Sequence, residues 1–210
     1  MKLSLFTVNL FEENTYLLSD DTNQAIVIDP GFNSDNERKA FVNYIEKNDI
    51  KIKAIINTHC HIDHILGVSF LKQKFNIPFW AHKKEEENLY NSKTSASLFD
   101  IKIDDIPQID KYIDENDIIE FGNIQLKTLF VPGHTSGHLA FYSEKEKFVI
   151  TGDVLFKDSI GRTDLPGGNL DVLLESIFTK LIPLGDDYTI FPGHGSNSTI
   201  GFEKRNNPFL

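Results

Sequence analysis

The 210-residue sequence predicts an α+β fold in which two β-sheets pack together with helices on the outside. Two observations support this class. Short runs rich in β-branched and aromatic residues recur along the whole chain, and amphipathic segments interrupt them. No low-complexity linker divides the chain and no repeat of 20–50 residues is visible, so we expect a single domain over residues 1–210.

The first third of the sequence predicts a strand meander followed by a helix. The expected strands are Leu3–Val8, Asn14–Ser19 and Gln24–Asp29. A turn at Asp29-Pro30-Gly31 closes the third strand. The segment Ser34–Asn48 predicts a helix because Phe41, Val42 and Ile45 have helical spacing, and Ser34 or Asp35 can cap its first turn.

The middle of the sequence is less regular. We expect a buried strand at Lys53–Thr58, an amphipathic helix at Asp63–Phe75 and a short strand at Ile77–Ala81. Residues 82–117 are interpreted as a helix followed by a long acidic surface excursion, with His82 at the surface or at the helix start.

The last part of the sequence predicts further strands and one helix. The strands are Ile118–Phe121, Ile124–Val131, Leu139–Ser143, Phe148–Thr151 and Tyr188–Phe191. The helix covers Leu170–Leu181, with Asn169 as its candidate cap.

Charge and cysteine content limit the function classes. The net charge of −10 and the pI near 5.1 argue against nucleic acid or an anionic membrane as a partner, because both require a basic surface. Cys60 is the only cysteine, so no intrachain disulfide forms. We see neither a secretory signal nor the roughly 20 apolar residues that span a bilayer. A cytoplasmic enzyme or binding protein is therefore expected.

The stretch NTHCHIDHILG, residues 57–67, concentrates metal-binding side chains directly after a predicted strand. His59, His61, Asp63 and His64 fall within six positions. Ordinary loop or core histidines do not explain this cluster, since crowding four such groups costs desolvation and repulsion unless an ion holds them. Imidazole nitrogens and a carboxylate suit Zn²⁺ and similar divalent metals. Cys60 should point away from its neighbours and pack inward.

Three more turns carry histidine or aspartate after predicted strands. VPGHTSGH supplies His134 and His138, IFPGHG supplies His194, and VITGDVLF supplies Asp153. Glycine and proline permit the sharp turns that present the next side chain. Six of the seven histidines thus lie in turns at strand ends, and the exception is His82.

The motifs THCHIDH, PGHTSGH, TGD and FPGHG, in this order, resemble the signature of the metallo-β-lactamase superfamily. The resemblance implies an αββα sandwich, with two mixed β-sheets packed face to face and helices outside. It implies one metal held by His59, His61 and His134, a second held by Asp63, His64 and His194, and Asp153 bridging both. Several β-lactamases of the superfamily have a cysteine where this sequence has Asp153, which argues against that subgroup.

The segments FKDSIGRTDLPGG and IGFEKRNNPFL look more specifically like the short glyoxalase II branch, the hydroxyacylglutathione hydrolases. Longer members have a C-terminal helical domain that supplies cationic contacts to glutathione. This resemblance implies hydrolysis of a thioester such as S-lactoylglutathione by a hydroxide bridging two metal ions, with Asp63 orienting that hydroxide. Zinc is the first expectation, with iron and manganese as the other metals. The alternatives are a persulfide dioxygenase with a single iron, and a lactone or other ester hydrolase.

Two further residues have open roles. Arg162, in the loop after Asp153, either grips a substrate carboxylate or forms a salt bridge to Asp164 or Asp158. His138 either supports a metal ligand by a hydrogen bond or is a structural histidine beside the turn.

Overall fold

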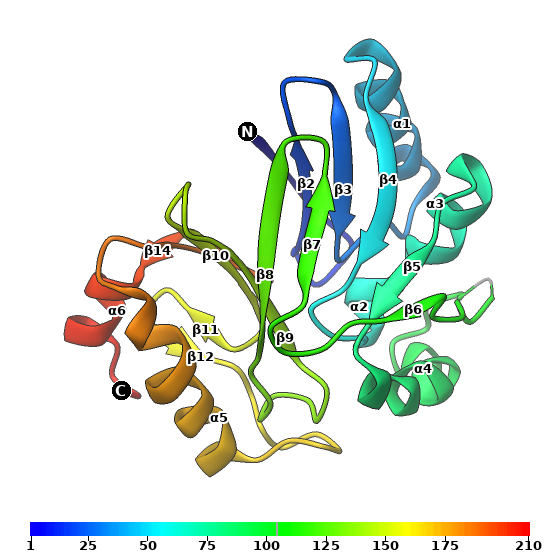
Figure 1. Cartoon of the computed structure of the whole chain (residues 1–210). Coiled ribbons are helices and arrows are strands. Elements are labelled where there is room, and N and C mark those ends of the chain that lie inside the picture. The colour runs from blue at the N-terminus through cyan, green and yellow to red at the C-terminus, as the bar shows by residue number, and fades with distance from the viewer. Residues whose placement is uncertain (104) are drawn as a thin grey trace. The chain divides into compact units, whose positions relative to one another are not determined.

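The computed structural model describes residues 1–103 and 105–210 and divides into two compact units. The first unit comprises residues 1–113 and 120–124, and the second comprises residues 114–119 and 125–210. Within the described residues, each unit carries most or all of one six-stranded mixed sheet (Figure 1). The α+β class with two mixed sheets is thereby confirmed, whereas the single domain over residues 1–210 stays a prediction.

The sheet of the first unit has the order β1-β2-β3-β4-β5-β6. Its strands are β1 (Lys2–Val8), β2 (Glu13–Ser19), β3 (Gln24–Ile28), β4 (Lys51–Ile56), β5 (Phe79–Ala81) and β6 (Lys111–Tyr112). The first three strands are antiparallel, as the meander predicts, and β3 to β6 run parallel. Strand β3 is almost fully buried, and β4 is buried at Ile52 and from Ala54 to Ile56 but exposed at its two lysines; the apolar, mostly β-branched residues account for the buried positions.

The helices of the first unit are α1 (Asp35–Lys47), α2 (Ile62–Ile65), α3 (Val68–Phe75), the 3₁₀ turn η1 (Lys83–Glu85) and α4 (Glu86–Leu98). Ser34 and Glu37 form a reciprocal capping box at the start of α1. The single helix expected over Asp63–Phe75 is wrong, because two separate helices, α2 and α3, occupy this segment and are interrupted at Leu66-Gly67. Gly67 donates to the Pro30 carbonyl at 2.7 Å, and a Cβ there would lie 2.8 Å from that oxygen.

The interpretation of residues 82–117 needs correction, apart from residue 104, which lies outside the described residues. Helix α4 continues to Leu98, well beyond the predicted helical start, and β6 adds a strand to the sheet within the expected excursion. His82 does begin the helical segment, since its side chain accepts from the backbone of Lys84, but it is buried and not on the surface.

The second sheet has the order β14-β13-β10-β9-β8-β7. Its strands are β7 (Ile118–Phe121), β8 (Ile124–Phe130), β9 (Leu139–Ser143), β10 (Phe148–Gly152), β13 (Thr189–Pro192) and β14 (Ser198–Thr199). Strands β10 and β13 pair in parallel. The strands β11 (Leu155–Phe156) and β12 (Ser159–Ile160) form a separate two-stranded antiparallel hairpin. Buried residues of these strands share a core with the helices that follow them.

The helical segments of the second unit are α5 (Leu170–Ser176), the π-helical turn η2 (Ile177–Leu181), the 3₁₀ turn η3 (Ile182–Leu184) and α6 (Ile200–Asn206). Asn169 caps α5 as expected, and the predicted helical segment Leu170–Leu181 is confirmed, with α geometry up to Ser176 and π geometry from Ile177 to Leu181. Helix α6 and the short strands β11, β12 and β14 are additional to the prediction. Among the described residues, no helix has the length and apolar character needed to cross a membrane.

Candidate metal centre

The first group of candidate ligands lies in the loop between β4 and α2. Asn57, fully buried, donates through Nδ2 to the His59 carbonyl at 3.1 Å and to the His64 carbonyl at 2.9 Å. Asp29, at the end of β3, accepts from Thr58 N at 2.7 Å and from Thr58 Oγ1 at 2.6 Å. These bonds fix the loop from both sides, so the backbone that presents the histidines is held in one conformation.

The histidines of this loop crowd together. The rings of His59 and His61 lie 4.8 Å apart between centroids, and those of His59 and His64 lie 4.1 Å apart. His59 and His64 are fully buried. His64 Nε2 lies 3.6 Å from Asp63 Oδ2, and His64 Nδ1 lies 3.2 Å from Asp29 Oδ2. Histidines bind metal ions through neutral imidazole nitrogens.

Glu13 on β2 is a buried acid behind this group. Burial raises the pKa of its carboxyl well above the ordinary value; His64 nearby lowers it and Asp29 raises it further. Its Oε1 lies 3.8 Å from His64 Nδ1, and its Oε2 accepts from Thr15 Oγ1 at 2.8 Å. Glu13 and Asp29 therefore place two acidic groups on the Nδ1 side of His64, opposite Asp63.

Cys60 packs inward, as predicted. The residue is 1% exposed and belongs to the hydrophobic core of the first unit. Burial, followed by the carboxylates of Glu85 and Asp29, raises the pKa of its thiol well above the ordinary value. A thiol that resists ionisation is a poor metal ligand, because the thiolate is the form that binds.

The second group of candidate ligands lies at strand ends of the second unit. His134 follows β8, and its Nδ1 makes a 2.8 Å hydrogen bond with the Arg162 carbonyl. Gly161, beside it, has no room for a side chain, since a Cβ would lie 1.8 Å from the Asp153 carbonyl oxygen. A carbonyl bonded to Nδ1 identifies that nitrogen as protonated, which leaves Nε2 of His134 as the available donor atom.

Asp153 is the centre of this second group. Its Oδ2 lies 3.6 Å from His134 Nε2 and 3.6 Å from His194 Nε2. Its backbone N donates to His138 Nε2 at 3.1 Å. His138 thus contacts the backbone of a candidate ligand, and its supporting role stays a prediction.

The donor separations fit divalent metal ions. Two donor atoms that bind the same ion at about 2.1 Å in a tetrahedral arrangement lie roughly 3.4 Å from each other. The 3.6 Å separations from His64 to Asp63, and from Asp153 to His134 and His194, match this spacing. The buried set Asp29, His59 and His64 also has the composition and proximity of a metal-binding cluster. Asp29 already accepts two hydrogen bonds from Thr58, so we assign it a supporting role.

Arg162 is paired with a carboxylate in the structure. Its Nε and Nη2 donate to the two oxygens of Asp164 at 2.8 and 2.7 Å. Both side chains are exposed, at 61% and 67%. These bonds lower the pKa of Asp164 to about 2. The predicted salt bridge is therefore present, and contact with a substrate stays a prediction.

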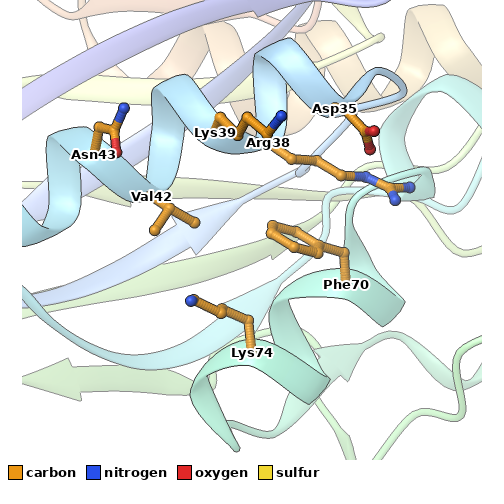
Figure 2. Close-up of a pocket in the computed structure, with 7 residues that line it drawn as sticks. All are labelled: Asp35, Arg38, Lys39, Val42, Asn43, Phe70 and Lys74. Carbon is orange, nitrogen blue, oxygen red and sulfur yellow. The ribbon is translucent and has the colours of Figure 1, made fainter.

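Figure 2 shows a surface pocket whose lining residues are not among the candidate ligands. It lies between α1 and α3 and is lined by Asp35, Arg38, Lys39, Val42, Asn43, Phe70 and Lys74. The Arg38 guanidinium packs 5.2 Å from the centroid of the Phe70 ring. None of the lining residues is a candidate ligand or bonds one in the contacts given above, so the pocket does not belong to the candidate centre.

Sequence reasoning missed the residues that hold the ligands in place. Asp29 ends the predicted strand Gln24–Asp29 and begins the predicted turn, and an aspartate at the end of a buried strand is a signal for a polar network. Asn57 adjoins the histidine motif and carries the same signal. Glu13 directly precedes the predicted strand Asn14–Ser19 and gives no such signal in the sequence.

Known proteins match the chain over nearly its whole length. The model of the metallo-beta-lactamase superfamily matches residues 8–194. The hydroxyacylglutathione hydrolase GloC of Haemophilus influenzae is 39% identical, over 100% of this chain and 98% of the relative. The probable metallo-hydrolase YqgX of Bacillus subtilis is 36% identical, over 100% and 98%.

Two solved structures are similar over both complete chains. The crystal structure of the B3 metallo-beta-lactamase BLEG-1 has a TM-score of 0.91 and 33% identity, over 100% of this chain and 99% of the other. TTHA1623, solved in a di-iron-bound form, has a TM-score of 0.88 and 31% identity, over 99% and 100%. The predicted fold and the motif resemblance are both confirmed, and the chain belongs to the metallo-beta-lactamase superfamily.

Proposed function

We propose that the two ligand groups together hold two divalent metal ions and that the chain hydrolyses thioesters of the hydroxyacylglutathione class. The observation that carries this proposal is the position of Asp153 Oδ2, at 3.6 Å from both His134 and His194. A carboxylate oxygen at this distance from two imidazole nitrogens can share one metal ion with each imidazole. The hydroxyacylglutathione hydrolase GloC, at 39% identity, supports the substrate class.

The proposed ligand assignment follows the superfamily pattern. One ion takes His59, His61 and His134, the other takes Asp63, His64 and His194, and Asp153 is shared. Zinc is the metal we expect from these nitrogen and oxygen donors. Iron is the strongest competitor because TTHA1623 was solved with two irons, and manganese is the third choice.

The proposed chemistry assigns separate tasks to the side chains. Divalent ions held by these residues would lower the pKa of a bound water to about 7 and would polarise the substrate carbonyl. Asp63, whose side chain is 14% exposed, holds and orients the attacking water. Asp153 and the buried histidines keep the donor atoms at fixed separations. A thiolate leaves as a weak base, so thioester cleavage needs no separate general acid.

The proposed partner and compartment follow from the same properties. The substrate is a small thioester and not a nucleic acid, since a chain of net charge −10 offers no broad basic surface. A cytoplasmic location suits a protein with one buried cysteine.

The deciding experiment combines metal analysis with a substrate panel on the purified protein. The panel contains S-D-lactoylglutathione, a thioester without glutathione, a lactone and a cephalosporin. We expect two metal ions per chain and the highest kcat/KM on S-D-lactoylglutathione. Asp63→Ala should abolish turnover while leaving the circular dichroism spectrum unchanged.

Two outcomes would contradict the proposal. One iron per chain together with oxygen uptake on glutathione persulfide would establish a dioxygenase. A higher kcat/KM on the lactone or the cephalosporin than on both thioesters would assign a different bond to the same scaffold.

A further inference from the structure

The C-terminal helix carries a buried carboxylate that the proposed chemistry does not use. Glu203, on α6, is fully buried. Its Oε2 accepts from Asp158 N and from Asn207 Nδ2, both at 2.9 Å, and its Oε1 accepts from Ser198 Oγ. A carboxylate with this many donors is held at a fixed position. It belongs to the IGFEKRNNPFL segment, for which the sequence indicated no role.

Asn207 makes a second connection to the same place. The residue is 5% exposed, and its Nδ2 donates to the Ser159 carbonyl at 3.0 Å. Glu203 and Asn207 therefore hold two consecutive residues, Asp158 and Ser159, at the tip of the β11–β12 hairpin. A hairpin of two-residue strands has little stability of its own, so these bonds from the α6 segment fix its position.

The other end of this hairpin adjoins two candidate ligands. Strand β11 begins two residues after Asp153, and β12 ends two residues before Arg162, whose carbonyl bonds His134 Nδ1 at 2.8 Å. Gly161 N donates to the Val154 carbonyl at 3.1 Å, which closes the base of the hairpin. Any shift of the hairpin would therefore move the Asp153 backbone and the carbonyl that orients His134.

We propose that Glu203 and Asn207 are positioning residues that set the orientation of Asp153 and His134 through the β11–β12 hairpin. The inference rests on the proposed function, because it takes both residues to be metal ligands. The Arg162 carbonyl selects the protonated nitrogen of His134, and Gly161 packs against the Asp153 carbonyl. Groups that orient ligands in this way control metal affinity as well as folding stability.

The test uses the full-length protein and measures zinc binding directly. Glu203→Ala and Asn207→Ala are titrated with zinc against a chromophoric chelator, and visible spectra are recorded after cobalt substitution. Each substitution removes bonds that hold the hairpin, and the hairpin carries the groups that orient Asp153 and His134. We therefore expect zinc affinity to fall by about 10–100-fold and the cobalt bands to shift. Glu203→Gln keeps one acceptor oxygen for the hairpin and should recover most of the affinity.

Thr199→Ala is the matched control. Thr199 Oγ1 caps the same helix by accepting from Phe202 N at 3.1 Å, and none of the contacts described above joins it to the hairpin. We expect this variant to lower Tm while zinc affinity and the cobalt spectrum stay at the wild-type values.

The proposal is overturned if Glu203→Ala and Asn207→Ala lower Tm but bind zinc as tightly as Thr199→Ala does. If Glu203→Ala fails to fold, Asn207→Ala decides the matter, since it removes far less of the network. A wild-type chain that binds no zinc, iron or manganese overturns the proposed metal centre, and this inference with it. Normal zinc binding in every variant overturns the positioning role and leaves the proposed function intact.

Discussion

Asp29 determines which nitrogen of His64 is available to a metal. Its carboxylate is 1% exposed, accepts two hydrogen bonds from Thr58 and lies 3.2 Å from His64 Nδ1. An imidazole whose Nδ1 faces a carboxylate presents Nε2 on the opposite side, and there Asp63 Oδ2 lies at 3.6 Å. A residue outside the proposed ligand set thus orients His64, which is a member of that set.

Asp29→Asn tests this dependence. Asparagine has the same size and tolerates the φ of 50° at this position, so the substitution removes charge without adding backbone strain. We expect metal affinity to fall about 10–100-fold, because the orienting carboxylate is lost. The free energy of unfolding should fall by about 1–3 kcal/mol, because a buried donor loses its acceptor. Chelator competition and urea unfolding measure the two effects.

Asp49→Asn is a suitable control for this experiment. Asp49 has a φ of 51° but is exposed, at the end of α1. The control should keep wild-type metal affinity and stability. Equal metal affinity in the two variants would show that the Asp29 carboxylate does not organise the loop.

The pairing of Arg162 with Asp164 allows a second residue-scale test. If Arg162 binds a substrate carboxylate, Arg162→Ala should raise KM about tenfold or more with kcat unchanged, because a charge-assisted hydrogen bond contributes about 1.5–3 kcal/mol. Asp164→Asn removes the competing carboxylate and should lower KM. Steady-state kinetics on S-D-lactoylglutathione separate the two parameters. If both variants lost Tm to the same extent and KM stayed unchanged, Arg162 would have only the structural role of a salt bridge to Asp164.

At the scale of elements, the local sequence pattern predicted the long strands and the capped helix α1. It did not predict the elements whose limits are set by tertiary contacts. Helix α1 has its own capping box, so its limits follow from the sequence. The break at Gly67 depends on Pro30, and β6, β12 and β14 are two-residue strands defined by pairing partners. The candidate metal ligands could be identified from the sequence because, like the capping box of α1, their motifs are short and local.

The supporting residues of the candidate site were not predictable in this way. Asp29, Glu203 and Asn207 act on residues 29 to 48 positions away in the chain. Their roles become visible only when the fold brings these positions into contact.

The β2–β3 turn offers an element-scale prediction about pH. Asp20 accepts hydrogen bonds from Thr22 and Gln24 and from Asn123 N in the β7–β8 turn. Burial raises the pKa of its carboxyl, but these bonds outweigh burial and hold the pKa below its ordinary value of 3.8. The folded state therefore gains stability from the ionised form, in full above the unfolded-state pKa and progressively less as the pH falls through the folded-state pKa.

Asp20→Asn should accordingly lower Tm at pH 7, and its difference from the wild type should shrink once the pH drops below 3.8. Thermal unfolding at a series of pH values measures this. Asp21→Asn is the neighbouring control: Asp21 is exposed and accepts only from the Asn123 side chain in the contacts described, so a smaller loss of Tm is expected. A difference that stays constant down to pH 2 would contradict the role of the Asp20 charge.

At the scale of the whole molecule, the proposed ligands are divided between the two compact units. The first unit supplies His59, His61, Asp63 and His64, and the second supplies His134, Asp153 and His194. An ion that binds the folded state alone stabilises every part of the chain that must be folded to bind it, by about 2.7 kcal/mol at a free-ion concentration of 100 Kd. The division of ligands therefore predicts that metal removal weakens both units.

Hydrogen exchange with and without metal tests this prediction. After treatment with a chelator, we expect faster exchange in residues 57–66 of the first unit and in residues 131–139 and 150–162 of the second, and re-addition of zinc should restore protection in all three segments. The α1 segment, residues 35–47, serves as the internal reference because it contains no proposed ligand. If zinc protected the ligand loop of one unit only, metal would bind to that unit's group alone, and a centre shared by His61, His134 and Asp153 would be wrong.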